Sequence, residues 1–205
     1  MDKRTNLFIL ILTIGVFGIL NTEMGVIGIL PKIADNFHIS ESKAGLLVSL
    51  FALAVAISGP ILPLLFSGIN RKKVLALVLG VFVLGNIVSI FASNFTLLLI
   101  ARIIPAFFHP VYISIALTAA ASSVSKEEAP KAVSKVIMGV SAGMVLGVPV
   151  TTYIASATSL EMAMLFFAIV NAIALIATLL FVPSMPVTER LSYGTQLSVL
   201  TKSIT

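Results

Sequence analysis

Hydrophobic positions along the chain gather into six long continuous runs, and polar residues are largely confined to the short stretches between them. The runs lie near residues 6–30, 44–66, 74–93, 95–121, 136–157 and 160–182. Each is long enough to cross about 30 Å of hydrocarbon as a helix. They lack the alternation of barrel strands, and only helices or closed barrels satisfy their backbone in lipid. The pattern therefore predicts an all-α membrane protein with six transmembrane helices.

The composition agrees with an integral membrane protein. Charged residues make up 10% of the chain, compared with about 25% in soluble domains, and the mean hydropathy is +1.14. The first run is too long for a signal-peptide core and no small-residue cleavage site follows it, so we interpret it as a retained span. The chain has no cysteine, which excludes disulfides, thiolate metal sites and thiol nucleophiles. We expect no metal and no other cofactor.

The charges between the runs predict the orientation in the membrane. Six crossings put both termini on one side, and that side collects ten of the 13 basic residues: Lys3, Arg4, Arg71, Lys72, Lys73, Lys126, Lys131, Lys135, Arg190 and Lys202. The other side has Lys32 and Lys43. Because short cytoplasmic loops are enriched in Lys and Arg, we expect a multi-pass protein of the cell membrane with both termini cytoplasmic. The basic loops also explain the sequence pI of 9.7, so we expect no nucleic-acid partner.

Two opposite charges lie inside predicted spans. Arg102 in the fourth run and Glu23 in the first are each costly in hydrocarbon, by about 2.5–3.5 kcal/mol on insertion scales, and each lies about 10 Å below the outer surface. They can meet directly or face one cavity from opposite walls. One interpretation is a static ion pair. We favour a carboxylate that binds and releases a proton while the arginine tunes its pKa, because Asn21, Thr22 and Glu23 are consecutive polar residues within the membrane.

Other polar residues are candidates for the same cavity. His109 is seven residues beyond Arg102, on almost the same helical face, and is either a packing residue or a second protonatable or substrate-contacting group. Pro105 and Pro110 loosen that helix, which is tolerated mainly where it lines a cavity or packs on protein. The remaining candidates, each of which also fits a helix–helix hydrogen bond, are Asn21, Asn86, Tyr112 and Asn171.

The fifth run carries Gly139, Gly143 and Gly147 four residues apart, followed by Pro149. Such a stripe is typical of close helix packing; the alternative is a hinge or gate that flexes during a conformational cycle. The segment also matches G-x-S-x-G around Ser141, a motif of serine hydrolases. Because that motif needs a strained strand-to-helix turn and here lies within a helical stripe, we expect no enzyme, and an intramembrane serine protease is a remote alternative.

Three motifs together resemble the major facilitator superfamily, in its twelve-span drug:proton antiporter branch near the bacterial sugar, arabinose and purine efflux permeases. They are Asn21–Gly25 continuing through Gly28–Ala34 in the first span, Leu99–Arg102 with Ala106 and His109 in the fourth, and Gly139–Pro149 in the fifth. One motif departs from the family. In the family, the loop between spans two and three usually carries an acidic residue ahead of a basic cluster. This chain keeps Gly59-Pro60 and Arg71-Lys72-Lys73, but its residues 67–70 contain no acid. We therefore expect the basic cluster to serve only for orientation and for contact with anionic lipid.

The resemblance implies a secondary transporter that couples proton entry to the efflux of a small organic molecule such as a drug, sugar, nucleoside or purine. Two six-helix halves would rock around a midplane site, and each half would contain two inverted three-helix repeats. Residues 1–182 would form the amino-terminal half, and residues 183–205 a cytoplasmic tail that starts the central loop. We expect an isolated half, either a truncated frame or fragment or a half-size unit that dimerises.

The expected partners are the substrate, protons, the lipid bilayer and a second six-helix half, which is a missing carboxyl-terminal half or a second copy. A function of another class stays open. The chain would then be a non-transporting membrane assembly subunit or an inactive truncated half, in which the Glu23–Arg102 pair holds helices together.

Overall fold

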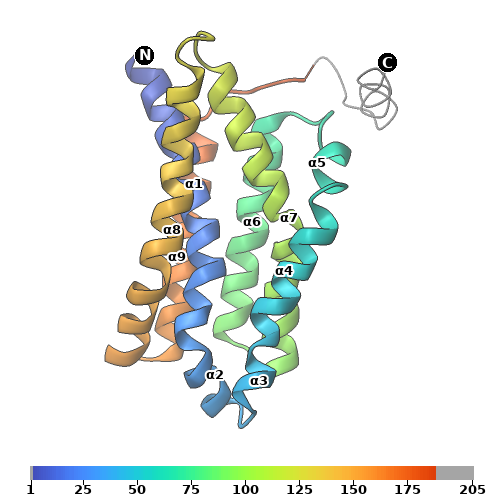
Figure 1. The fold of residues 1–205 in the computed structure, drawn as a ribbon, viewed down its shortest axis with the longest axis vertical. Helices are drawn as coiled ribbons and strands as arrows, with labels where there is room; N and C mark the ends of the chain where they lie inside the picture. The colour runs from blue at the N-terminus through green and yellow to red at the C-terminus, as the bar shows by residue number, and fades with distance from the viewer. Residues whose placement is uncertain (1, 188–205) are drawn as a thin grey trace, which may run out of the picture.

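The computed structural model describes residues 2–187, and within them the chain is helical with no strand (Figure 1). The helices are α1 Lys3–Gly25, the 3-10 turn η1 Val26–Ile29, α2 Leu30–Asn36, α3 Glu41–Ala44, α4 Leu46–Ser58, α5 Leu62–Leu65, α6 Arg71–Ile90, α7 Phe95–Ser122, α8 Ala129–Ala157 and α9 Leu160–Phe181. Six stretches are long and apolar enough to cross a membrane, which confirms the predicted number of spans.

The first span is longer than predicted, because α1, η1 and α2 follow one another from Lys3 to Asn36. The helix tightens at η1, where the chain packs closely on α8. A Cβ on Gly25 would lie 2.6 Å from the hydroxyl oxygen of Thr151. The hydroxyl of Thr152 donates to the carbonyl oxygen of Gly28 at 3.1 Å. Pro31 in the first turn of α2 suits a helix start, where its missing N–H costs nothing.

The second span is not the continuous helix that the apolar run over 44–66 predicts. Helix α4 ends at Ser58, and a separate short helix, α5, begins at Leu62. Pro60 has no N–H to continue the helical hydrogen bonds, and Pro63 occupies the first turn of α5. The apolar run therefore contains a break that hydropathy alone does not reveal.

Side-chain caps explain where three other spans begin. Asn70 accepts from the backbone N–H of Lys72 at the start of α6, Asn94 from that of Leu97 at the start of α7, and Ser159 from that of Met162 at the start of α9. Asn, Ser and Asp are the preferred residues at this position. Helix α8 begins at Ala129, seven residues before the predicted 136. The prediction is late because the first residues of this helix include polar ones and do not belong to the apolar run.

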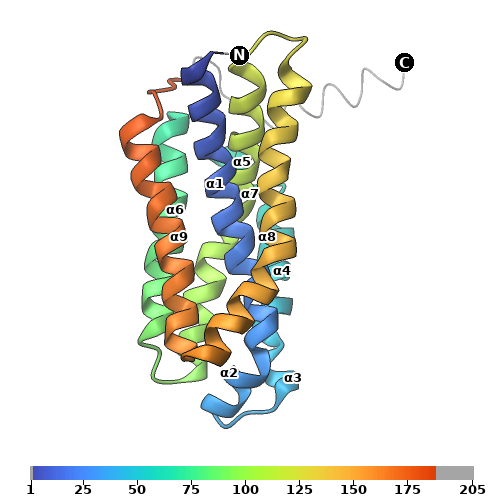
Figure 2. The ribbon, with the colours of Figure 1, turned by 90° about the vertical axis from the view of Figure 1, so that its left-hand side faces the viewer.

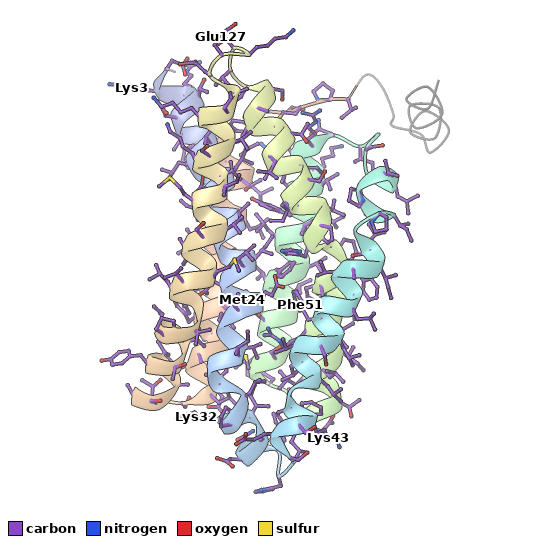
Figure 3. The ribbon with its side chains drawn as sticks, in the orientation of Figure 1. Lys3, Met24, Lys32, Lys43, Phe51 and Glu127 are labelled. Carbon is purple, nitrogen blue, oxygen red and sulfur yellow. The ribbon has the colours of Figure 1, made fainter. Side chains whose placement is uncertain are left out.

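Helix α1 lies inside the bundle, in contact with α7, α8 and α9, while α6 packs on α7 and α9, and α4 packs on α7 (Figures 1 and 2). The largest buried side chains include Ile9 and Leu12 of α1, Phe82 of α6, Tyr112 of α7 and Phe167 of α9. Burial of these side chains holds α1 at the centre. The charged loops lie at the two ends, with Lys3 and Glu127 at one end and Lys32 and Lys43 at the other (Figure 3).

Candidate functional site

Glu23 and His109 face each other between α1 and α7. The Oε2 atom of Glu23 lies 3.4 Å from Nε2 of His109, and their side chains are 18% and 13% exposed. The ring of Phe51 on α4 lies edge-on to the imidazole, with the ring centroids 6.3 Å apart. Figure 3 shows Met24, the neighbour of Glu23, and Phe51 between the two ends of the bundle. The carboxylate and imidazole thus meet inside the membrane span, where α1, α4 and α7 come together.

Arg102 is bound to the residue next to Glu23 rather than to Glu23 itself. Its Nη2 atom donates to the carbonyl oxygen of Thr22 at 2.7 Å, and its guanidinium lies 5.9 Å from the centroid of the Phe167 ring. The side chain is 3% exposed, and its Nε and Nη1 atoms have no hydrogen-bond partner within residues 2–187. A direct Glu23–Arg102 ion pair is not formed in that part of the chain. Arg102 instead contacts the backbone of α1 one residue before Glu23.

Thr22 connects four helices. Its hydroxyl donates to the carbonyl oxygen of Gly18 at 2.9 Å and accepts from the side-chain amides of Asn171 on α9 and Asn86 on α6, at 2.9 and 3.4 Å. Together with the Arg102 bond, these contacts join α1 to α6, α7 and α9. Asn86 and Asn171 are therefore helix–helix hydrogen-bonding residues. Sequence reasoning misses the central role of Thr22, although its position between Asn21 and Glu23 is a signal.

Two predicted cavity residues are fully buried within this bundle. Asn21 is two residues before Glu23, which turns its side chain by about 200° around the helix. The backbone of Asn21 packs on α8, where a Cβ on Gly143 would lie 3.1 Å from its nitrogen. The hydroxyl of Tyr112 packs against Gly15 of α1. Because both side chains are 0% exposed, the structure places them in packing interfaces, not on an open cavity.

The cavity that His109 lines lies between α4–α5 and α7. It has a volume of about 580 Å³, and its lining includes Gly59, Pro60 and Pro63 together with His109 and Pro110. The break after α4 creates this space, because α5 is a separate short helix. The sequence predicts a chamber between the first and fourth spans. The structure instead puts the cavity on the second span's side of His109, and neither Glu23 nor Arg102 belongs to its lining.

The glycine stripe of α8 packs against α1. Gly139 lies against the carbonyl oxygen of Thr13, a Cβ on Gly143 would lie 2.6 Å from Cβ of Leu20, and one on Gly147 would lie 3.3 Å from the backbone nitrogen of Gly25. These contacts support the packing interpretation. Helix α8 runs unbroken through Pro149 to Ala157, so its role as a hinge stays a prediction.

Two further expectations concern side chains elsewhere. Ser141 is exposed in the middle of α8, so it is not on the sharp turn that a nucleophile elbow requires. Among Arg71, Lys72 and Lys73 at the start of α6, Arg71 donates from Nη1 to the hydroxyl of Ser122 at 3.3 Å. Within residues 2–187 no cluster of His, Cys, Asp and Glu could hold a metal ion.

Several known proteins are similar in sequence to most of this chain. The MFS-type transporter YtbD of Bacillus subtilis (strain 168) is 38% identical over 176 residues, which cover 86% of this chain and 44% of that protein. The inner membrane transport protein YdhP of Escherichia coli (strain K12) is 30% identical over 197 residues, covering 96% and 51%. The putative transporter AraJ of the same strain is 28% identical over 177 residues, covering 86% and 45%. The chain spans about half the length of these relatives.

Solved structures show the same fold. The human organic anion transporter MFSD10 (TETRAN) superposes with a TM-score of 0.76 at 16% identity, over 95% of this chain and 52% of that one. The peptide transporter POT in complex with sulfate superposes with a TM-score of 0.75 at 13% identity, over 96% and 43%. Both matches describe the architecture of one half of a transporter, which agrees with the predicted fold class.

The family assignment rests on the sequence match as well as on the fold. The family model described as Major Facilitator Superfamily matches residues 12–202, and it includes the segments with Glu23, Arg102 and the glycine stripe of α8. Members of this family are membrane transporters, not enzymes, and the six apolar helices make this chain a multi-pass membrane protein. The chain belongs to the major facilitator superfamily.

Proposed function

We propose that this chain is the amino-terminal half of a secondary transporter that exchanges protons for a small organic molecule leaving the cell. The observation that carries the proposal is the contact between the Glu23 carboxylate and the His109 imidazole, 3.4 Å apart within the membrane span. Ionisable residues inside spans commonly mark ion pathways and proton relays. The substrate would be a drug, a sugar, a nucleoside or a purine.

Glu23 is the proposed proton carrier, and His109 is its proposed partner. A carboxylate and an imidazole at this distance can share one proton through a hydrogen bond, with only a small movement of either side chain. The nearby cavity beside His109, of about 580 Å³, supports a route for water or substrate to that residue. A proton added to Glu23 removes a negative charge from the site, so that binding of protons and of a cationic or polar substrate become coupled.

Arg102 has a proposed positioning and electrostatic role. The bond from its Nη2 to the Thr22 carbonyl fixes the guanidinium one residue away from Glu23, and the network around Thr22 holds that carbonyl in place. The fixed positive charge of Arg102 attracts the ionised carboxylate, so a movement that changes the distance between the two groups would also change the proton affinity of Glu23. The rocking of two halves would supply such a change.

A second six-helix half is the proposed partner, supplied by a longer protein or by a second copy. Helices α4 and α8 are the least enclosed spans, and α8 exposes large side chains such as Met138, Met144 and Val145. These faces are available to lipid or to another half. With both termini in the cytoplasm, protons would enter from the outer end, where Lys32 and Lys43 lie.

The proposal is tested in inside-out vesicles that contain this chain together with its second six-helix half, which is either a carboxyl-terminal half joined to it or a second copy. Accumulation of a panel of radiolabelled drugs, sugars and nucleosides is measured with and without an imposed proton gradient. We expect gradient-dependent accumulation of at least one compound, with loss of that component in Glu23→Gln. The matched control is Glu161→Gln, which removes the exposed carboxylate in the first turn of α9 and should leave accumulation unchanged.

The same experiment separates transport from an assembly role. Size-exclusion chromatography of each variant reports whether the protein keeps its oligomeric state. Loss of accumulation with unchanged assembly supports proton coupling through Glu23. Loss of assembly in Glu23→Gln would favour the assembly subunit, and gradient-dependent accumulation that survives in this variant would contradict the proposed role of Glu23.

A further inference from the structure

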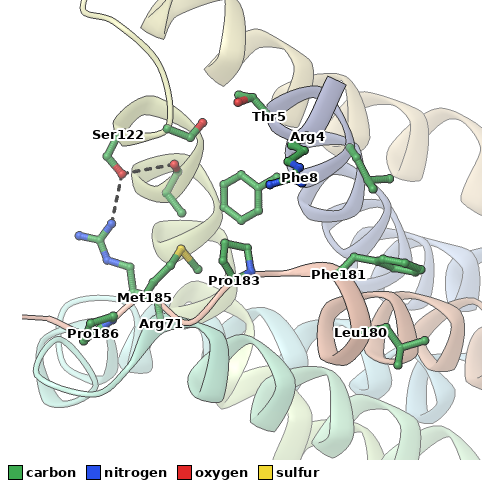
Figure 4. Close-up of a pocket in the computed structure, with 13 residues that line it drawn as sticks. Arg4, Thr5, Phe8, Arg71, Ser122, Leu180, Phe181, Pro183, Met185 and Pro186 are labelled. Carbon is green, nitrogen blue, oxygen red and sulfur yellow. Dashed lines mark hydrogen bonds between the residues drawn. The ribbon is translucent and has the colours of Figure 1, made fainter. Parts of the chain in front are cut away.

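A second cavity lies at the end of the bundle that holds the amino terminus (Figure 4). It has a volume of about 780 Å³ and is formed by the first turns of α1, the start of α6, and the ends of α7 and α9. The segment after α9 closes one side through Pro183 and Met185. None of the residues assigned to proton coupling belongs to its lining, so this cavity is separate from the Glu23 site.

The wall formed by the segment after α9 is held by specific hydrogen bonds. The backbone N–H of Arg71 donates to the carbonyl oxygen of Met185 at 3.1 Å. The side chain of Asn70 donates to the hydroxyl of Ser184 at 2.7 Å and accepts from the backbone N–H of Met185 at 3.4 Å. These bonds tie the chain beyond α9 to the start of α6, so the cavity has a defined wall on this side.

Two arginines from different helices supply the charge of this cavity. Arg4 comes from α1 and Arg71 from α6 (Figure 4). Neither forms an ion pair within residues 2–187, and no acidic side chain among these residues lines the cavity. The hydroxyl of Ser122 accepts from Nη1 of Arg71 and donates to the carbonyl oxygen of Ala119. This bond orients the guanidinium of Arg71 at the cavity, and it uses one of the five N–H donors that an arginine side chain carries.

The remaining lining is apolar and reaches the side of the bundle. Phe8 is buried, whereas Leu7, Leu180 and Phe181 are 44%, 68% and 59% exposed. These three side chains lie at the ends of membrane-spanning helices, α1 and α9, where hydrocarbon gives way to headgroups. The cavity thus combines a cationic end with an apolar flank, in the order that a phospholipid presents along its length.

We propose that this cavity binds the headgroup phosphate of an anionic glycerophospholipid, with one acyl chain lying over Leu7 and Leu180. Arginine is suited to this ligand because its planar guanidinium donates two parallel hydrogen bonds to phosphate oxygens. Basic pockets between membrane helices bind anionic lipid headgroups, and the volume is within the range of small-molecule sites. A soluble phosphate would use the arginines but not the exposed apolar flank, so the flank favours the lipid.

The test is native mass spectrometry of the full 205-residue chain in detergent, titrated with phosphatidylglycerol. We expect Arg4→Gln and Arg71→Gln each to weaken binding about fivefold, as loss of one basic side chain near an anionic headgroup implies. Lys3→Gln and Lys73→Gln are matched controls, because they remove the same charge from neighbouring positions of the same helices and do not line the cavity. These controls should change affinity less than about twofold.

Further arms identify the source of the phosphate and exclude misfolding. Leu180→Ser keeps the charge and should weaken lipid binding, while leaving any binding of inorganic phosphate unchanged. Equal weakening by the lysine controls would mean non-local attraction and overturn the site. Inorganic phosphate or glycerol 3-phosphate that binds as tightly as the lipid would assign the cavity to a soluble anion and overturn the proposal. Melting temperatures measured without lipid confirm that each variant is folded before its affinity is compared.

Discussion

The sequence shows which residues inside the spans carry charge, but it does not show which of these residues contact each other. The cost of charge in hydrocarbon singles out Glu23, Arg102 and His109 from the sequence alone. Which of them touch depends on how α1 and α7 are rotated against each other, and the structure pairs Glu23 with His109 instead of Arg102. Tyr112 packing on Gly15 is one of the contacts made at that rotation, and no spacing in either helix reveals it.

The network around Thr22 predicts a measurable cost for one missing hydroxyl. Thr22→Val keeps the shape of the side chain but removes the group that accepts from Asn86 and Asn171. Interhelical hydrogen bonds in membranes are worth about 0.6 kcal/mol on average. Asn171 keeps its bonds to the carbonyl oxygens of Gly18 and Phe167. The buried amide of Asn86 instead loses its bond to Thr22, which adds to the loss. We expect a decrease of about 1–2 kcal/mol in the free energy of unfolding, measured by denaturation in mixed micelles.

Thr118→Val is the control for this substitution. Its hydroxyl is exposed and donates only to the carbonyl oxygen of Ser114 within α7, so removing it should cost about 0.5 kcal/mol or less. Equal effects of the two substitutions would show that the Thr22 network adds no stability beyond a local helix bond.

Whole helices are predictable where apolar runs are bounded by capping residues, and poorly predictable where a break lies inside a run. Asn70, Asn94 and Ser159 are sequence signals that the structure uses as caps. The break between α4 and α5 is not predicted, because Gly59-Pro60 is short and hardly changes the mean hydropathy of the run around it. The glycine stripe of α8 is predictable as a packing surface from its spacing, but its partner helix α1 is not.

The α1–α8 contact predicts opposite effects of the same substitution at two glycines. Gly143→Ala adds a Cβ that would lie 2.6 Å from Cβ of Leu20, and such overpacking typically costs about 1–3 kcal/mol. Gly80→Ala on α6 adds a Cβ with nothing within 4 Å, so the better helix propensity of alanine should stabilise by about 0.5–1 kcal/mol. Unfolding in mixed micelles measures both. Stabilisation by Gly143→Ala would contradict the close packing of α8 on α1.

At the scale of the molecule, six spans and the separation of charges between two ends follow from the amino-acid pattern. The number of spans depends on the length of the apolar runs, and the orientation depends on the charges of the loops. Neither prediction changes when a helix boundary is wrong by a few residues. The location of the cavities cannot be predicted in this way. The one beside His109 depends on the α4–α5 break, and the one between Arg4 and Arg71 depends on hydrogen bonds from Asn70 and Arg71 to residues 184–185.

The predicted orientation can be measured directly, because the chain has no cysteine of its own. Lys43→Cys and Lys126→Cys each introduce one exposed thiol, at opposite ends of the bundle. With a membrane-impermeant maleimide on intact cells, we expect labelling of the thiol at position 43. The thiol at position 126 should react only after the membrane is permeabilised. The reverse pattern would place both termini outside and overturn the proposed direction of proton entry.

The central claim is that Glu23 binds and releases a proton within the membrane. It is tested most directly by infrared difference spectroscopy of the reconstituted chain across a pH titration, which detects the carbonyl band of a protonated carboxylic acid. The chain has eight Asp and Glu residues, so the signal of Glu23 is the component that differs between the wild type and Glu23→Gln. We predict such a component in the wild type, its loss in Glu23→Gln, and a displaced titration midpoint of this component in His109→Gln. Identical titrating carboxyl bands in the wild type and in Glu23→Gln would contradict the claim.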